Sequence, residues 1–210
     1  QILFDNENDL PSYLKLAYLP NPGAVRLRLS AYEVEGESVA REIDRQFETL
    51  RKIIPHNIIG FETATMQELV HKILTERGLT LATAESCTGG VIASRFTAMP
   101  GASAYFKGGV VTYWNQTKSL LLNVSADTIA RYGVVSEQVV RQMAEGARRA
   151  AEADYGIATT GIAGPTGGSA EKPVGTVWIA VSSPERTVVL LKQCGTDRGQ
   201  IIDRASAFAI

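Results

Sequence analysis

The chain has 210 residues, an apolar fraction of 45% and a formal net charge of −1 at pH 7. These values predict a globular protein with one large domain, or with a large and a small one. They provide no overall charge that would attract nucleic acid or an anionic membrane, so we expect neither as a partner.

The chain shows no sign of membrane insertion or export. No apolar run approaches the roughly 18 residues of a spanning helix, and Gln1–Asp9 lacks the basic and apolar regions of a signal peptide. The start also lacks an initiator Met, so we expect a fragment or a processed chain. Cys87 and Cys194 are the only cysteines, which favours a reducing, cytoplasmic location.

The first part of the chain predicts a small α+β unit. Tyr13–Tyr18 and Val25–Ala31 have the pattern of strands, and Pro20–Gly23 between them has the composition of a turn. Apolar residues at steps of three and four between Val39 and Ile54 predict an amphipathic helix. Ile58–Ile59 offers a further short strand.

The second part alternates helices with strands. We place the boundary near Thr63, which gives domains at residues 1–63 and 64–210. Thr65 and Glu68 form a capping-box pattern at the start of a helix. The predicted strands cover residues 79–83, 109–114, 155–160, 175–181 and 187–191. The predicted helices cover residues 91–96, 117–122 and 136–151, with a last one from Asp197 to Ile210. This alternation predicts an α/β fold, with a mixed sheet between two layers of helices.

Ala84–Gly90 is the most informative segment, because it places two candidate nucleophiles, Ser86 and Cys87, in a strand-to-helix turn. The start of a helix presents free backbone N–H groups, and such donors beside a nucleophile can stabilise an oxyanion. Adjacent side chains of an extended segment point to opposite faces, so Ser86 and Cys87 are not expected to share one site. Cys87 is either the nucleophile of an alternative cysteine amidase or an ordinary buried cysteine.

The base that would activate Ser86 is not expected to be a histidine. His56 and His71 both precede the turn and are expected to have structural or solvated positions. A Ser-His-Asp triad is therefore disfavoured, and the chain has no His-Glu-x-x-His or Cys-x-x-Cys pattern of a zinc site. We expect no metal.

Tyr113 and Lys118 are the remaining candidates for proton transfer. A lysine desolvated in a pocket loses proton affinity and can deprotonate a serine, and a tyrosine hydroxyl can relay the proton. The alternative is a half-buried strand tyrosine and a surface lysine. Glu85 either orients Lys118 or caps the turn.

A glycine-rich loop, Gly161–Gly168, follows a predicted strand as phosphate-binding loops do, but it lacks a Gly-Lys-Thr ending. A plain turn is its alternative. Arg198, beside Asp197, either binds a phosphate or carboxylate or is a surface residue at a helix start.

Taken together, these segments resemble the C-terminal domain of the CinA (competence/damage-inducible) family, from about Met66 to the end. The matching motifs are Ala84–Gly90, Pro100–Ser103, Val111–Tyr113 with Lys118, Gly133–Ser136, Thr160–Pro165 and Pro173–Val177. The resemblance implies hydrolysis of the carboxamide of nicotinamide mononucleotide (NMN) to nicotinate mononucleotide and ammonia, without a cofactor. It implies Ser86 as nucleophile, assisted by Tyr113 and Lys118.

The resemblance also implies substrate-binding residues and an assembly. The substrate-binding residues are Glu85, Thr88, Gly89, Gly90, Thr160, Gly161, Gly164 and Arg198. Members of the family look oligomeric, so a homo-oligomer is expected, and Arg198 is a candidate for the site of a neighbouring subunit. The alternatives that stay open are the cysteine amidase and a non-catalytic module that binds a pyridine nucleotide.

Residues 13–60 resemble the KH-like middle domain of full-length family members. They have no Gly-x-x-Gly loop, so RNA binding in the usual KH mode is not expected. Full-length members also carry an N-terminal pyrophosphatase-type domain. These 210 residues lack it, and its metal-dependent hydrolysis of ADP-ribose is not assigned to them.

Overall fold

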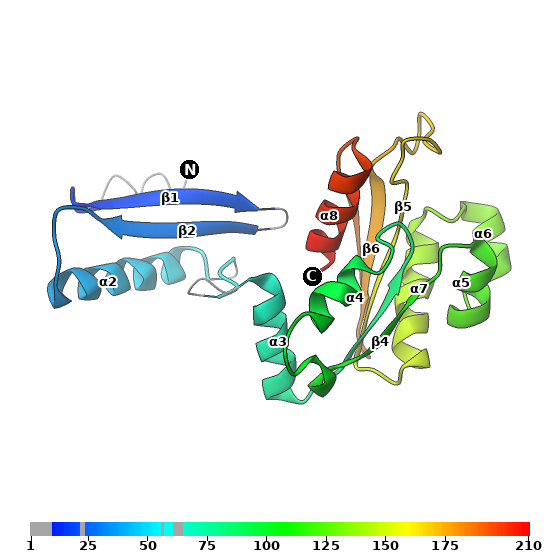
Figure 1. Cartoon of the computed structure of the whole chain (residues 1–210), viewed down its shortest axis with the longest axis horizontal. Helices are drawn as coiled ribbons and strands as arrows, with labels where there is room; N and C mark the ends of the chain where they lie inside the picture. Colours follow the sequence, from blue (N-terminus) through cyan, green and yellow to red (C-terminus); the bar gives the residue numbers. More distant parts are fainter. Residues whose placement is uncertain (1–9, 22–23, 56, 61–64) are drawn as a thin grey trace. The chain divides into compact units, whose positions relative to one another are not determined.

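The computed structural model describes residues 10–21, 24–55, 57–60 and 65–210. The chain divides into two compact units, Gln1–Thr63 and Ala64–Ile210 (Figure 1). Several sequence predictions fall outside the described residues: the start of the chain, the second half of the Pro20–Gly23 turn, His56 and the boundary at Thr63.

The first unit contains an antiparallel pair of strands and one helix. Strands β1 (Leu14–Asn21) and β2 (Ala24–Ala31) pair along their whole length, and helix α2 (Glu37–Ile53) follows. Leu14 and Leu50 are its buried apolar side chains among the described residues. The predicted strand at Ile58–Ile59 is wrong, because these residues have no strand partner and Ile59 is exposed.

The second unit is built on a five-stranded mixed sheet in the order β4-β3-β5-β6-β7. The three strands β4, β3 and β5 are parallel, whereas β6 and β7 are antiparallel to their neighbours. The strands are β3 (Leu81–Glu85), β4 (Phe106–Val111), β5 (Tyr155–Gly161), β6 (Thr176–Ser182) and β7 (Thr187–Gln193). The predicted α/β class with a mixed sheet is confirmed.

Helices cover both faces of this sheet (Figure 1). Helices α3 (Met66–Arg77), α4 (Val91–Thr97) and α8 (Arg198–Ala209) pack on one face, with a short 3₁₀ helix η1 (Ala102–Ala104). Helices α5 (Asn115–Leu122), α6 (Ala126–Tyr132) and α7 (Glu137–Ala150) pack on the other face. Each face has its own apolar cluster, so β3 lies buried between two cores.

Local sequence signals explain most helix boundaries. Thr65 and Glu68 form the predicted capping box of α3, and Gly78 ends that helix in the left-handed conformation. The side chain of Ser136 caps α7, and the side chain of Asp197 caps α8. These caps satisfy N–H groups that have no partner within the helix.

Helix α7 lies unusually close to its neighbours. Its predicted apolar stripe is buried at Val139, Val140, Met143, Ala144 and Ala147. A Cβ on Gly146 would lie 2.1 Å from the carbonyl oxygen of Leu122, and one on Gly156 would lie 2.2 Å from that of Ala144. Both glycines are therefore required by close backbone packing of α7 on α5 and β5.

The structure differs from the predicted elements in three places. Strand β3 covers Leu81–Glu85 and not residues 79–83, so Ala84 and Glu85 belong to the strand and not to the turn. Strand β4 begins at Phe106 and ends at Val111, so Tyr113 and Trp114 follow the strand and do not belong to it. Helix α6 was not predicted, because its 7 residues make only about two turns, too few to show a helical period. None of the described helices is long and apolar enough to cross a membrane.

Candidate active site

Three parallel strands end at one edge of the sheet, and the candidate residues follow these ends. Ser86 follows β3, Thr112 follows β4, and Thr160 and Gly161 end β5. The helix after β3 packs on one face and the helix after β4 packs on the other. Ligands of open α/β sheets bind where the connections diverge in this way, beside the carboxyl ends of the strands.

Glu85 caps helix α4. Its carboxylate accepts hydrogen bonds from the backbone N–H groups of Gly90, Ile92 and Ala93, at 3.0, 3.1 and 2.8 Å. The side chain is 1% exposed and makes no hydrogen bond to Lys118. The capping alternative is therefore correct. The predicted contact of Glu85 with substrate is not supported, since both carboxylate oxygens already have partners and are buried.

Ser86 and Cys87 lie on opposite faces of the sheet, as the alternation of side chains predicted. Ser86 reaches the α5 side, where it meets Lys118, whereas Cys87 packs in the apolar cluster beneath α4 and α8. Burial raises the pKa of the Cys87 thiol to about 12. A thiol is nucleophilic only as thiolate, so this environment disfavours the cysteine amidase.

The Lys118 side chain is buried beside Ser86. It is 1% exposed, and its Nζ atom lies 2.6 Å from the carbonyl oxygen of Thr112 and 3.3 Å from Oγ of Ser86. Burial lowers the pKa of Lys118, because desolvation disfavours the ammonium form. The alternative of a surface lysine is wrong.

Backbone hydrogen bonds fix this lysine relative to the serine. The N–H of Thr112 donates to the carbonyl oxygen of Glu85 at 2.8 Å, which extends the pairing of β3 with β4 by one residue. The N–H of Ser86 donates to the carbonyl oxygen of Thr159 at 3.1 Å. The sheet thus holds both Ser86 and the Thr112 carbonyl, which accepts a hydrogen bond from the Lys118 amine. The role of Thr112 was missed in the sequence, where its only signal is a polar residue between two strand formers.

The backbone donors near Ser86 are fewer than predicted. The N–H of Gly89 donates to the carbonyl oxygen of Ser86, and that of Gly90 is taken by Glu85. Both N–H groups thus have partners within the fold, and a contact of Gly89 or Gly90 with substrate stays a prediction. The N–H groups of Cys87 and Thr88 make no hydrogen bond to another residue in the described part of the chain, so they remain the candidate donors. The Thr88 hydroxyl is buried against that of Thr159, at 2.7 Å.

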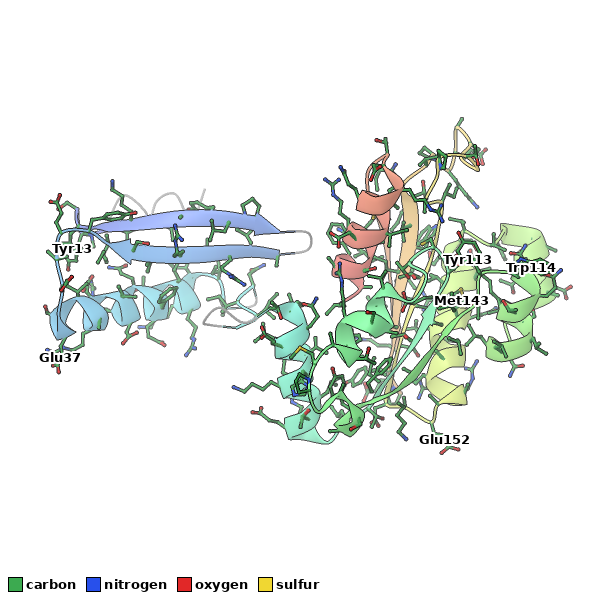
Figure 2. The ribbon with its side chains drawn as sticks, viewed as in Figure 1. Tyr13, Glu37, Tyr113, Trp114, Met143 and Glu152 are labelled. Atoms are coloured by element: carbon green, nitrogen blue, oxygen red, sulfur yellow. The ribbon has the colours of Figure 1, made fainter. Side chains whose placement is uncertain are left out.

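Tyr113 and Arg198 form a pair at the edge of the site. Figure 2 labels Tyr113 next to Trp114, in the segment that joins β4 to α5. The Tyr113 hydroxyl accepts a hydrogen bond from Nη2 of Arg198 at 2.9 Å, and Nη1 of Arg198 donates to the carbonyl oxygen of Gly164 at 2.6 Å. Among the described residues, Tyr113 has no hydrogen bond to Ser86 or Lys118. The residue is 56% exposed and follows β4, so the alternative of a strand tyrosine is wrong, and its role in proton transfer stays a prediction.

The residues at the end of β5 have structural partners. The Thr160 hydroxyl is buried and donates to the carbonyl oxygen of Val134 at 2.8 Å. A Cβ on Gly161 would lie 2.8 Å from the carbonyl oxygen of Thr176 and 3.0 Å from Sγ of Cys87. Gly164 has a φ of +73° and offers its carbonyl to Arg198. Only Gly164 of these three is thereby linked to the pair at the edge of the site.

The described residues include no group of three or more His, Cys, Asp or Glu side chains placed to hold a metal ion. The Lys118 amine contacts the Ser86 hydroxyl, the Thr112 carbonyl contacts that amine, and the N–H groups of Cys87 and Thr88 follow Ser86 directly in the chain. This set can move a proton from a hydroxyl and can stabilise negative charge nearby.

The fold and the motifs match one family. The sequence model of this family, described as the CinA C-terminal domain, matches residues 63–210. The chain belongs to the CinA family. The match covers the unit that carries the site and does not include the residues before 63, so a KH-like first unit stays a prediction.

Solved CinA structures share this fold. The competence/damage inducible protein CihA from Agrobacterium tumefaciens is 40% identical, with a TM-score of 0.67 over 68% of this chain and 88% of that one. A CinA superfamily protein from Escherichia coli is 36% identical, with a TM-score of 0.66 over 74% of this chain and 94% of that one.

A CinA-like protein from Flavobacterium psychrophilum is 45% identical over 95% of this chain and 48% of its own length. The chain spans about half the length of the curated relatives it matches.

Proposed function

We propose that the second unit hydrolyses the carboxamide of a nicotinamide nucleotide, with NMN as the first candidate substrate. The observation that carries this proposal is the buried Lys118 amine beside the Ser86 hydroxyl. A lysine with a lowered pKa is a base for a serine that has no histidine partner. The choice of NMN rests on the resemblance described above.

The first half of the reaction forms an acyl-enzyme. Neutral Lys118 accepts the Ser86 proton while Oγ bonds to the carboxamide carbon, and the carbonyl oxygen becomes an oxyanion. The N–H groups of Cys87 and Thr88 are the donors available to this oxyanion. The C–N bond then breaks as Lys118 returns its proton to the leaving nitrogen, and ammonia departs.

The second half uses the same base on water. Lys118 accepts a proton from a water molecule that attacks the ester carbon, and it returns this proton to Oγ as the C–O bond to Ser86 breaks. The products are nicotinate mononucleotide and free enzyme. No metal takes part in these steps. Arg198, held by Tyr113, supplies positive charge for the phosphate of the nucleotide.

The test is ammonia release from NMN by the 210-residue chain, with EDTA present. We expect steady turnover by the wild type and by Cys87→Ala, and none by Ser86→Ala. Activity that is lost in Cys87→Ala but kept in Ser86→Ala would transfer the nucleophile to cysteine. Tight NMN binding without turnover by the wild type would support a non-catalytic module. Related nicotinamide nucleotides, assayed in parallel, define the substrate range.

We also propose that the chain self-associates. In support, five large apolar side chains between Val111 and Leu121 are exposed, with Trp114 and Leu120 at 71% and 78%. Exposed apolar patches often mark interaction sites. Light scattering after gel filtration should give the wild type the molar mass of an oligomer. Leu120→Glu should lower this mass toward that of a monomer. Leu191→Glu is the control, since Leu191 is an exposed leucine on β7. The reverse result would place the contact on β7.

A further inference from the structure

Thr112 carries a buried hydroxyl without a partner, next to the catalytic pair. The residue is 0% exposed, and its Oγ1 atom has no hydrogen-bond partner within the described residues. Its backbone is fully engaged, because its N–H donates to Glu85 and its carbonyl oxygen accepts from Lys118. A buried polar group without a partner destabilises a fold, so such groups call for an explanation.

The hydroxyl lies on the same face of the sheet as the lysine. Val111 points toward α4, since its Cγ2 atom lies 3.5 Å from the position of a Cβ on Gly90, the residue that precedes α4. The next side chain, that of Thr112, therefore points to the opposite face. Ser86 and Lys118 occupy that face. The Lys118 amine hydrogen-bonds to the carbonyl oxygen of Thr112 and, in this structure, not to its hydroxyl. A rotation about χ1 of Thr112 is the movement that would aim the hydroxyl at the amine.

The charged form of Lys118 needs one more acceptor than the site otherwise offers. An ammonium group has three protons to donate. Two acceptors are in place, the carbonyl oxygen of Thr112 and Oγ of Ser86. Ser86 leaves this role once its oxygen is bonded to the acyl carbon. A hydroxyl accepts as readily as it donates, so Thr112 can serve the ammonium form.

We propose that the Thr112 hydroxyl is a positioning residue that stabilises the ammonium form of Lys118 during proton transfer. This inference rests on the proposed function, because it assigns a role within the same site. Two other ionisable groups lie close to the turn. The Cys87 thiol is held neutral by burial, and the Glu85 carboxylate is bound to α4 on the other face.

Thr83 provides a matched control. It is also a buried strand threonine, 1% exposed, whose Oγ1 atom has no partner among the described residues. Its hydroxyl packs against Gly109 and faces Ala93 of α4, on the side away from Lys118. Thr112→Val and Thr83→Val both replace a hydroxyl by a methyl group of similar shape. Neither variant is expected to have a lower unfolding temperature than the wild type, because each loses a buried hydroxyl without a hydrogen-bond partner.

The experiment measures kcat and KM for ammonia release against pH, together with thermal unfolding. For Thr112→Val we expect a fall in kcat on the order of ten- to a hundredfold, the worth of one hydrogen bond to a charged group. KM should stay unchanged. The acidic limb of the kcat profile should move to lower pH, because a destabilised ammonium ion loses its proton more readily. Thr83→Val should match the wild type in all three quantities.

A substrate-independent measurement separates this inference from the proposed function. Labelling of Ser86 by a small sulfonyl fluoride reports its reactivity without NMN. If NMN is not hydrolysed but Ser86 is labelled, slower labelling of Thr112→Val with a shifted acidic limb still supports the role of Thr112. A wild type that neither releases ammonia nor takes the label overturns both proposals.

Two results overturn the inference alone. The first is a Thr112→Val variant with the kcat and acidic limb of the wild type. The second is an equal loss in Thr83→Val, which indicates a general effect on the sheet. If Thr112→Val does not fold, Thr112→Ser and Thr112→Ala replace it. The serine variant keeps the hydroxyl and should keep the wild-type limb, whereas the alanine variant should lose it, and equal behaviour of the two contradicts the proposal.

Discussion

The Nζ atom of Lys118 lies 3.3 Å from the Oγ atom of Ser86, although Ser86 follows strand β3 and Lys118 lies on helix α5. The contact depends on the parallel pairing of β3 and β4, which brings the residues after both strands to one edge. The lysine reaches that edge from the first turns of α5. Serine and base are thus positioned by the sheet and need no flexible loop.

The base can be tested by two substitutions that differ in one property. Lys118→Met keeps the length of the side chain and removes the amine, and Lys118→Arg keeps a charge that is not lost at any working pH. We expect both to reduce ammonia release by at least about a hundredfold, the lower range for general base catalysis. Thermal unfolding should show that Lys118→Met remains folded. An active Lys118→Arg would argue that positive charge, and not proton transfer, is what the site requires.

The lowered pKa of Lys118 also predicts a pH dependence of stability. Burial lowers this pKa in the folded chain, whereas an unfolded lysine has its ordinary value of about 10.4. Between these values the unfolded chain binds the additional proton, so the free energy of unfolding rises with pH. Below the folded pKa both states carry the proton, so the free energy of unfolding stops changing with pH through this group and is lowered by the full cost of the buried ammonium. Urea titrations from about pH 7 to 10 should give a steeper rise for the wild type than for Lys118→Met, and parallel curves would contradict the assignment.

Both cysteines should resist thiol reagents in the folded chain. Burial raises the pKa of Cys87 to about 12 and also raises that of Cys194. We expect alkylation by iodoacetamide, followed by mass spectrometry, to modify neither residue near pH 8 until urea unfolds the chain. Cys87→Ala serves to assign the modified peptide. Rapid native labelling of Cys87 with loss of activity would revive the cysteine mechanism.

Tyr113 was predicted to handle protons, but its hydroxyl contacts Arg198 instead. If it only orients Arg198, Tyr113→Phe should raise KM about three- to tenfold, the worth of roughly one hydrogen bond, and leave kcat almost unchanged. Arg198→Lys should raise KM similarly, because an ammonium group cannot hold Tyr113 and Gly164 with two separate N–H donors. The check is a comparison of steady-state constants with NMN. A large fall in kcat for Tyr113→Phe alone would return the proton-transfer role to the tyrosine.

The sequence predicts the second unit well where strong local signals exist. The periodic stripe of α7 and the capping box at Thr65 follow from residue types and spacing. The turn predicted at Ala84–Gly90 is present but begins at Ser86, because β3 runs on to Glu85. Strand β4 was misplaced at both ends, because two glycines in its interior dilute the apolar pattern. Its true end determines that Thr112 continues the pairing and that Tyr113 does not belong to the strand.

The site was predictable in its residues more than in its contacts. The absence of a suitable histidine left lysine and tyrosine as bases, and the burial of Lys118 agrees with the first of them. The partners of Glu85 are local, at most eight residues along the chain, and capping was one of its two predicted roles. The partner of Tyr113 lies 85 residues away on α8. That contact follows from tertiary packing, which no local pattern in the sequence specifies.

The carboxylate of Glu85 has a consequence for where an anion can bind in the proposed reaction. Helix starts attract anions, but the start of α4 already carries a carboxylate of its own chain. That helix start is therefore closed to the phosphate of a nucleotide, which has to find its positive charge elsewhere. Arg198 at the start of α8 is the group proposed for that task.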